Sequence, residues 1–250
     1  GLNTPKGYEG SSQNQEPNTQ HLNSRPPFFA MFSLSNRRVA RWAFPWVSLV
    51  FRFWARLFAP RLRVTGRHNI PRYGRVIFAP NHISNVDPQF IGAALRYPAR
   101  YMAKKTLWDI AWLHFPLQFF GAFPVNTGAP DRAALKMALE VLAAHQPLVI
   151  FPEGFVSEDA QLGEIMAGVA TLALKSGATV IPVGLYGLDK ISPYGETVPR
   201  PTLARVAMHF GEPLWLDDLR EMPSKTAREH LNQRLKNGIL AAYEKARDTR

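Results

Sequence analysis

The 250-residue sequence contains no cysteine. This absence excludes disulfide bonds, thiolate metal ligands and a cysteine nucleophile. Its histidines and acidic residues show no spacing typical of a metal site, so we expect neither a metal ion nor a bound cofactor. Any chemistry must come from the remaining polar side chains.

Acidic residues are absent from residues 17–86, a region that contains eleven arginines. The formal net charge of +11 therefore arises almost entirely near the N-terminus. Such an uneven distribution predicts contact with an anionic partner, which could be membrane headgroups, nucleic acid or an acidic protein.

Long hydrophobic runs are also missing, because the apolar stretch Trp42–Phe51 is far shorter than the roughly 20 residues that span a bilayer. Residues 36–58 instead predict an amphipathic helix, kinked or split at Pro45. Four of its arginines, Arg38, Arg41, Arg52 and Arg56, fall within an arc of about 60°. An interfacial membrane helix is favoured over an ordinary surface helix that packs its aromatic residues on the domain, and nucleic-acid binding is disfavoured. The predicted membrane-contact residues are Arg38, Arg41, Trp42, Trp46, Arg52, Trp54 and Arg56.

The domain organisation follows from composition. Residues 1–30 are polar and rich in Gly, Ser, Asn, Gln and Pro, so they predict a disordered tail. They lack the charged and apolar regions of a secretory signal, and Met31 is an alternative start. Residues 31–60 are predicted to form the membrane-interfacial segment, and residues 61–250 a single domain.

Within residues 61–250, short β-rich runs alternate with helical patterns. This order predicts an α/β domain with a largely parallel central sheet flanked by helices. The expected strands are 62–65, 76–80, 100–103, 122–125, 148–151, 180–184 and 205–210. The expected helices are 88–95, 106–120, 131–144, 164–175 and 224–246.

The stretch APNHISNVDPQF, residues 79–90, places a polar cluster directly after an expected strand. On one helix His82 and Asp87 would point about 140° apart, whereas a strand-to-helix turn would bring them together. Asp87 would then accept from one imidazole nitrogen and leave the other free as a general base. Two alternatives stay open. Asp87 before Pro88 is a typical helix N-cap, and His82 could be a hydrogen-bonded core histidine.

Two more segments stand out downstream. IFPEGF, residues 150–155, ends an apolar strand with a carboxylate and a flexible glycine, a pattern suited to holding hydroxyls or a phosphate. TVIPVGLYG, residues 179–187, is a buried strand pattern interrupted by Pro182, which marks an edge, a bulge or a kink.

Together these segments resemble the glycerolipid acyltransferases of the lysophosphatidate acyltransferase type. NHISNVD is similar to that family's N-H-x-S-x-x-D block, which contains the HX4D motif, and GAFPVN to its second block. FPEG resembles the start of its F-P-E-G-T-R block, VIPVGL its fourth block, and YMAKKTLW its lysine-bearing stretch. The resemblance covers about residues 62–211.

The resemblance implies transfer of a fatty acyl group from acyl-CoA or acyl carrier protein to a lysophospholipid hydroxyl, in first place that of 1-acylglycerol-3-phosphate. His82, oriented by Asp87, would deprotonate this hydroxyl without an acyl-enzyme intermediate or a cofactor. Ser84 as a nucleophile is disfavoured, because it lies only two residues from His82. The expected partners are membrane lipids and the acyl carrier rather than nucleic acid, at the cytoplasmic face of the membrane. The predicted substrate-binding residues are Glu153, Gly154, Lys104, Arg132, Asn81 and Ser84.

The sequence departs from the family pattern at two positions, Thr127 and Val156, where the family usually has arginine. Arginine is the preferred bidentate partner of a phosphate, so these losses leave the acceptor open. Arg132 and Lys104 or Lys105 are candidate substitutes. Alternatively, Phe155 and Val156 line a pocket for a less charged acceptor. A rival hypothesis of another class is a catalytically silent lipid-binding protein of the same fold.

Overall fold

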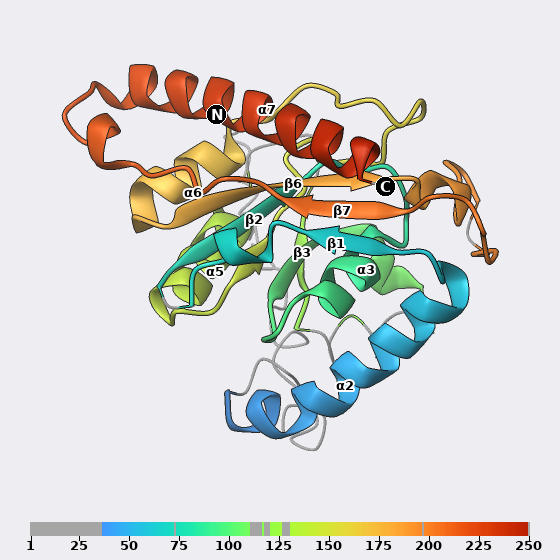
Figure 1. The fold of residues 1–250 in the computed structure, drawn as a ribbon. Helices are drawn as coiled ribbons and strands as arrows, with labels where there is room; N and C mark the ends of the chain where they lie inside the picture. The colour runs from blue at the N-terminus through green and yellow to red at the C-terminus, as the bar shows by residue number, and fades with distance from the viewer. Residues whose placement is uncertain are drawn as a thin grey trace, which may run out of the picture.

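The computed structural model describes residues 37–72, 74–110, 117, 121–126, 131–196 and 198–249. These residues form a seven-stranded sheet in the order β1-β7-β6-β2-β5-β3-β4 (Figure 1). The strands are β1 Arg63–Thr65, β2 Val76–Pro80, β3 Arg100–Lys104, β4 Phe123–Val125, β5 Leu148–Val149, β6 Thr179–Tyr186 and β7 Ala207–Phe210.

Five neighbouring strands of this sheet, from β6 to β4, run parallel. β7 is antiparallel to β6, and β1 is parallel to β7. The predicted α/β class with a largely parallel sheet is therefore confirmed. Because the five parallel strands end at the same edge, the segments that follow β2, β3 and β5 meet there.

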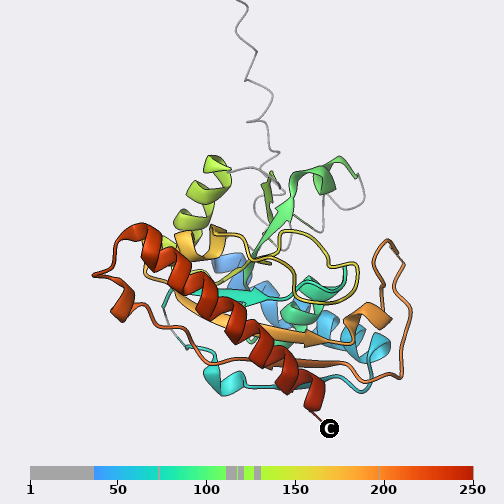
Figure 2. The ribbon, with the colours of Figure 1, turned by 90° about the horizontal axis from the view of Figure 1, so that it is seen from above.

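Helices cover both faces of the sheet. α2 Arg37–Phe58 and α3 Asp87–Ala94 pack on one face, and α5 Arg132–Ala143, α6 Gly168–Ser176 and α7 Ser224–Asp248 on the other. Figure 2 looks down on α7, with α2 and α3 beyond the sheet. Side chains of β2 alternate between the two cores, since Phe78 packs with the α2 and α3 side and Ile77 with the other. Short 3₁₀ helices complete the fold: η2 Arg67–Asn69, η3 Lys105–Asp109, η4 Leu188–Lys190 and η5 Asp217–Leu219.

Two expected helices differ from the structure. In the helix expected over 106–120, the first residues form the 3₁₀ helix η3, Leu117 is helical, and residues 111–116 and 118–120 lie outside the described residues. The helix expected from residue 164 begins only at Gly168, because the preceding residues form a long loop beside the end of β5. The predicted tail, residues 1–30, also lies outside the described part.

Close packing of α7 on the sheet depends on glycines at the contact, and Gly184 makes the tightest approach among them. A Cβ atom added to Gly184 in β6 would lie 2.1 Å from the backbone carbonyl carbon of Ala242 in α7. Only a residue without a side chain permits this approach, so Gly184 sets how closely α7 covers β6.

α2 lies against α3, where the Trp54 ring meets the Phe90 ring edge-on at a centroid distance of 5.3 Å. The opposite side of α2 carries a stripe of exposed apolar side chains at helical spacing, which we call the α2 stripe: Trp46, Leu49, Val50, Phe53 and Leu57. Among the described residues, no helix combines the length and the apolar character needed to cross a bilayer.

Candidate active site

His82 and Asp87 meet in the turn between β2 and α3. β2 ends at Pro80 and α3 begins at Asp87, with Pro88 in its first turn. The intervening chain folds back so that His82 Nδ1 lies 2.9 Å from Asp87 Oδ2. The turn therefore produces the pairing that one regular helix would not allow.

The Asp87 carboxylate holds the backbone of this turn as well as the ring. Asp87 Oδ2 also accepts from the N–H groups of Ile83, at 2.8 Å, and Ser84, at 2.9 Å. Burial raises the pKa of Asp87, while the hydrogen bonds from His82 and from these two backbone groups act in the opposite direction. The N-cap reading of Asp87 is wrong, because Val86 is the N-cap residue of α3 and no side-chain capping bond is formed there; Asp87 is the first residue of α3, and its carboxylate holds the preceding turn and orients the imidazole.

The His82 ring is fixed on its other side by Phe151, which stacks on it at a centroid distance of 3.9 Å and an interplanar angle of 24°. The side chain of His82 keeps 15% exposure, whereas that of Asp87 has none. Nδ1 faces the buried carboxylate, so Nε2 is the ring nitrogen available to a substrate. This is the geometry of a general base with an orienting carboxylate.

Glu153 lies beside the same turn, at the end of the β5 segment. Its Oε1 accepts from the His82 backbone N–H at 2.8 Å, and its Oε2 from that of Gly163 at 2.9 Å. Burial raises the pKa of this carboxyl group, opposed by both N–H groups. Glu153 thus ties the His82 backbone to the loop after β5, and its contact with substrate stays a prediction.

Asn81 and Ser84 have their polar atoms bound within the protein. The Asn81 side-chain amide donates to Leu185 O at 3.0 Å, and its carbonyl accepts from Leu185 N at 2.7 Å. The buried Ser84 hydroxyl donates to Ser192 O at 2.8 Å. These bonds fix the turn to β6 and to the loop after it, and direct substrate contact by either residue stays a prediction.

The remaining predicted substrate-binding residues surround the same edge of the sheet. Gly154 follows Glu153 with a φ of 79°, a left-handed conformation that favours glycine. Lys104 ends β3 and Arg132 begins α5, and both are exposed. Of the two positions that lack the family's arginine, Val156 is partly buried, and Thr127 lies outside the described residues.

The predicted membrane-contact residues divide between the faces of α2. Trp46 is exposed in the α2 stripe, Arg52 and Arg56 are exposed on its flank, and Trp54 packs inward against Phe90. The side chains of Arg38, Arg41 and Trp42 lie outside the described ones.

Several residues of the site and of α2 were missed by sequence reasoning. Phe151 is the first residue of the FPEG segment, but nothing in the sequence indicated that it stacks on His82. Ser192 was missed because its contact with Ser84 spans 108 residues. The α2 stripe was missed because the packing of α2 on α3 determines which of its apolar side chains face outward.

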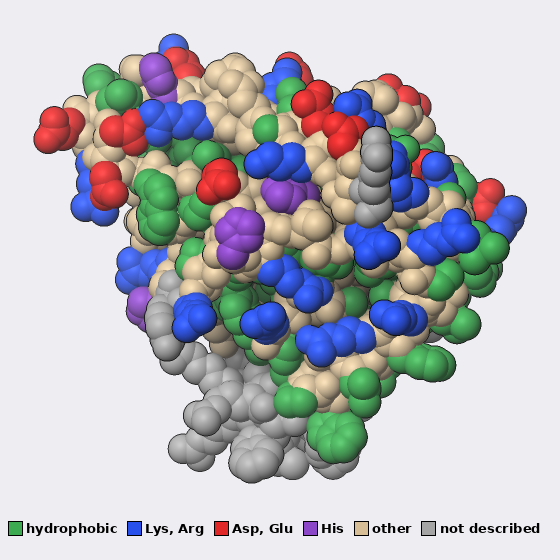
Figure 3. Space-filling model, in the orientation of Figure 1, with side chains coloured by type: hydrophobic (Ala, Val, Ile, Leu, Met, Phe, Trp, Pro, Cys, Tyr) green, Lys and Arg blue, Asp and Glu red, His purple; other side chains and the backbone are tan. Residues whose placement is uncertain are grey.

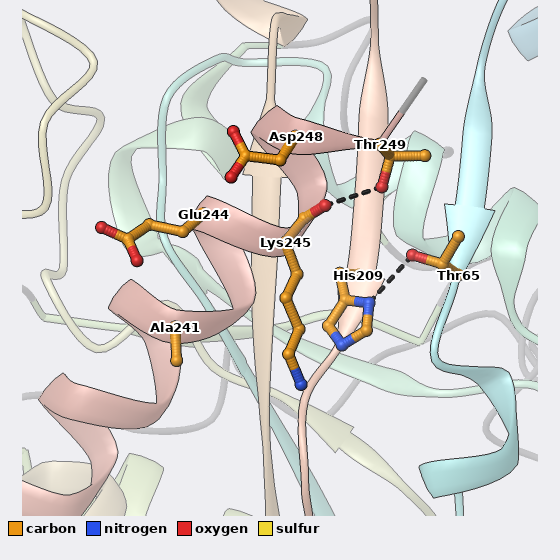
Figure 4. A pocket seen from close by; sticks show the side chains of 7 residues that line it. All are labelled: Thr65, His209, Ala241, Glu244, Lys245, Asp248 and Thr249. Carbon is orange, nitrogen blue, oxygen red and sulfur yellow. Dashed lines mark hydrogen bonds between the residues drawn. The ribbon is translucent and has the colours of Figure 1, made fainter.

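A cavity of about 560 Å³ lies elsewhere, between β1, β7 and the end of α7 (Figure 4). None of its lining residues belongs to the His82 turn or to the loop after β5. His209 contributes to its wall, with Nδ1 2.8 Å from the Thr65 hydroxyl. Burial lowers the pKa of His209, and Lys245 lowers it further. This histidine is a hydrogen-bonded core residue without a carboxylate partner of the Asp87 kind.

Within the described part of the chain, no group of three or more histidine and acidic side chains is arranged to hold a metal ion. The site at the sheet edge therefore offers a base, an orienting carboxylate and backbone groups.

The family model described as Acyltransferase matches residues 61–186. A 1-acyl-sn-glycerol-3-phosphate acyltransferase of Bacillus subtilis (strain 168) is 30% identical over 181 residues, which make up 70% of this chain and 86% of that protein. One of Borreliella burgdorferi is 30% identical over 131 residues, so the match spans only about half of that relative, 52%.

Among solved structures, the 1-acyl-sn-glycerophosphate acyltransferase of Thermotoga maritima superposes with a TM-score of 0.65 at 22% sequence identity. The match covers 86% of this chain and 88% of that one. At this identity the likeness shows the fold. The family-model match includes the segment that carries His82, Asp87 and Glu153.

Proposed function

The chain belongs to the acyltransferase family and is an O-acyltransferase, and on this basis we propose that it transfers a fatty acyl group from an acyl thioester to a lysophospholipid hydroxyl. The observation that supports the mechanism best is the 2.9 Å contact between His82 Nδ1 and Asp87 Oδ2, which leaves Nε2 facing the substrate side. The pathway served is phospholipid biosynthesis.

In the proposed reaction, His82 Nε2 takes the proton of the acceptor hydroxyl while its oxygen attacks the thioester carbonyl carbon. The new C–O bond forms, the C–S bond breaks, and the departing thiolate receives the proton from the imidazolium. Asp87 stabilises the imidazolium between these two proton transfers. No acyl-enzyme intermediate, metal ion or cofactor is required.

We propose 1-acylglycerol-3-phosphate as the first acceptor to test, because the named relatives carry this activity in their names. Lys104 and Arg132 are the cations we assign to its phosphate, in place of the arginines missing at positions 127 and 156. The competing acceptor is a less charged lysolipid, a reading favoured by the exposed Phe155 beside Gly154.

For the location of the reaction, we propose that the protein binds peripherally to the cytoplasmic face of the membrane through α2. The α2 stripe would enter the headgroup region, with Arg52 and Arg56 beside it. A lipid acceptor could then reach His82 from the membrane surface. The donor would be acyl-CoA or acyl carrier protein.

The catalytic proposal is tested by measuring acyl transfer with His82→Ala. We expect a loss of about 10²-fold or more, because a general base contributes at least this much to the rate. His230→Ala, which removes an exposed histidine of α7, is the matched control and should retain full activity. Equal rates for wild type and His82→Ala would reject the mechanism and favour the silent lipid-binding protein.

The acceptor is tested by offering a panel of lysolipids with labelled acyl-CoA and labelled acyl carrier protein, with products identified by mass. We expect the diacyl product of 1-acylglycerol-3-phosphate to dominate, and Lys104→Gln and Arg132→Gln to raise its KM. A preference for an uncharged lysolipid would instead assign the exposed apolar surface at Phe155 to the headgroup.

A further inference from the structure

The apolar surface of α2 continues onto a second element, the loop between η4 and β7. The backbone N–H of Thr202 donates to the carbonyl of Phe58, the last residue of α2, at 2.8 Å. Leu203, which is 69% exposed, follows Thr202, and Leu57 at the end of the α2 stripe precedes Phe58, so this bond joins the backbone segments that carry the two leucines. Two segments far apart in the sequence therefore present neighbouring apolar side chains.

The same loop carries another outward apolar residue, Val198, which is 70% exposed. The loop is held at its base by the bond from Arg200 N–H to Ile191 O, at 2.8 Å. Its chain is therefore attached to the fold on both sides of Val198.

The loop is also attached to the active-site turn. Ser84 Oγ donates to Ser192 O at 2.8 Å, and Asn85 Nδ2 donates to Glu196 O at 3.1 Å. Its exposed apolar side chains are thus presented by a segment fixed both to α2 and to the turn that carries His82.

A cluster of arginines lies next to α2, formed by Arg52 of α2, Arg67 of η2 and Arg96 after α3. All three are exposed, and burial together with the charges of Arg96 and Arg52 lowers the pKa of Arg67. Figure 3 shows basic side chains in a band beside the apolar rim along the lower right of the molecule, with acidic side chains mostly at the top. We call the α2 stripe together with Val198 and Leu203 the apolar rim. An apolar rim beside a band of basic side chains matches a lipid bilayer, which has an apolar interior and anionic headgroups.

We propose that the protein docks on an anionic bilayer through a surface larger than α2, in which Val198 and Leu203 insert beside the α2 stripe and the Arg52, Arg67 and Arg96 cluster contacts lipid phosphates. This inference rests on the proposed membrane function and adds two elements of the catalytic domain to it. Two insertion points fix the orientation of the molecule on the membrane, which a single helix would leave free to rotate about its axis. The His82 turn, tied to the loop, would then keep a constant position relative to the lipid.

The absence of cysteine allows a direct test with single-cysteine probes in the full chain. Val50→Cys, Val198→Cys and Leu203→Cys are labelled with a dye whose emission shifts to the blue in an apolar medium. Trp215→Cys and Leu240→Cys are the controls, since both side chains are exposed and apolar. Trp215 follows Leu214, which pairs with Val180 near the start of β6, whereas the proposed loop follows the end of β6.

On vesicles of phosphatidylcholine mixed with phosphatidylglycerol, we expect blue shifts at positions 50, 198 and 203 and none at 215 and 240. A shift at 50 without shifts at 198 and 203 would overturn the inference and leave docking through α2 intact. No shift at any position would reject both. A shift that needs no vesicles but grows with protein concentration would overturn the inference in favour of a second copy of the chain.

A charge test is independent of the labels. Arg67→Gln combined with Arg96→Gln should lower partition onto the anionic vesicles by about tenfold or more. Lys225→Gln combined with Arg228→Gln removes the same charge from α7 and should change it by less than about twofold. Equal losses in the two variants would refute the arginine cluster as a lipid contact. Acyl transfer to a detergent-dispersed lysolipid should persist in both variants, so a failure of docking is distinguishable from a failure of the proposed catalysis.

Discussion

The Asp87 carboxylate uses a single oxygen to hold an imidazole and two backbone N–H groups. Asp87→Asn should therefore lower kcat by about 10²-fold or more, because an amide no longer stabilises the imidazolium or selects its tautomer. Acyl transfer under saturating substrate measures this loss. Asp217→Asn, an exposed position in η5, provides the control and should retain wild-type kcat. An Asp87→Asn variant with wild-type kcat would limit the role of Asp87 to holding the backbone of the turn.

Glu153 acts on the same histidine through the main chain. Glutamine at this position has one acceptor oxygen for two N–H groups, so Glu153→Gln leaves either His82 or Gly163 facing an amide NH₂. We expect kcat to fall about tenfold, in line with the loss of one charged hydrogen bond, with little change in the KM for the lysolipid. Steady-state kinetics separate the two parameters. A raised KM with unchanged kcat would instead identify Glu153 as an acceptor contact.

These two carboxylates show how far sequence reasoning reaches at the residue scale. The pairing of His82 with Asp87 is local, so the spacing and the strand-to-turn context were enough to predict it. The hydrogen bond from His82 N–H to Glu153 spans 71 residues and depends on β2 and β5 lying side by side. The sequence identified the FPEG segment but contained no local signal for this partner.

At the element scale, α5 places Arg132 at the sheet edge through its N-cap. Asp131 accepts from Ala134 N–H at 2.9 Å and from Asn126 N–H at 2.9 Å, and these bonds lower its pKa from 3.8. Asp131→Ala should cost about 1 kcal/mol of unfolding free energy at neutral pH, as measured by urea denaturation. Because the folded pKa is depressed, this contribution is present above 3.8 and lost as the pH falls through the lower folded value.

The matched variant for this prediction is Asp131→Asn, which keeps a capping oxygen but does not titrate in this range. Its stability should stay within a few tenths of a kcal/mol of wild type at neutral pH. A difference between Asp131→Ala and wild type that persists unchanged well below pH 3.8 would contradict the assignment of the effect to the carboxylate.

The α2 helix shows why an element can be predicted while its orientation is not. The sequence predicted an amphipathic helix at 36–58, and the structure has one at Arg37–Phe58. Trp54 was assigned to the membrane from the amphipathic pattern of the helix, yet it packs on Phe90, because the position of α3 determines which side of α2 faces inward. The outward stripe is therefore a tertiary property that the helical period alone leaves open.

On the scale of the whole molecule, the charge distribution predicts how membrane binding depends on salt. The eleven arginines of residues 17–86 have no acidic residue among them, and they include Arg52 and Arg67, two of the three members of the arginine cluster next to α2. The range of their electrostatic attraction falls from about 10 Å at 0.1 M salt to about 3 Å at 1 M. Binding to phosphatidylglycerol-containing vesicles should therefore weaken steeply as NaCl is added, as measured by co-sedimentation.

A weaker fraction should survive at high salt, because insertion of the apolar rim is not screened. Pure phosphatidylcholine vesicles should show only this salt-insensitive fraction, and strong salt dependence there would mean that the arginines act on something other than anionic lipid.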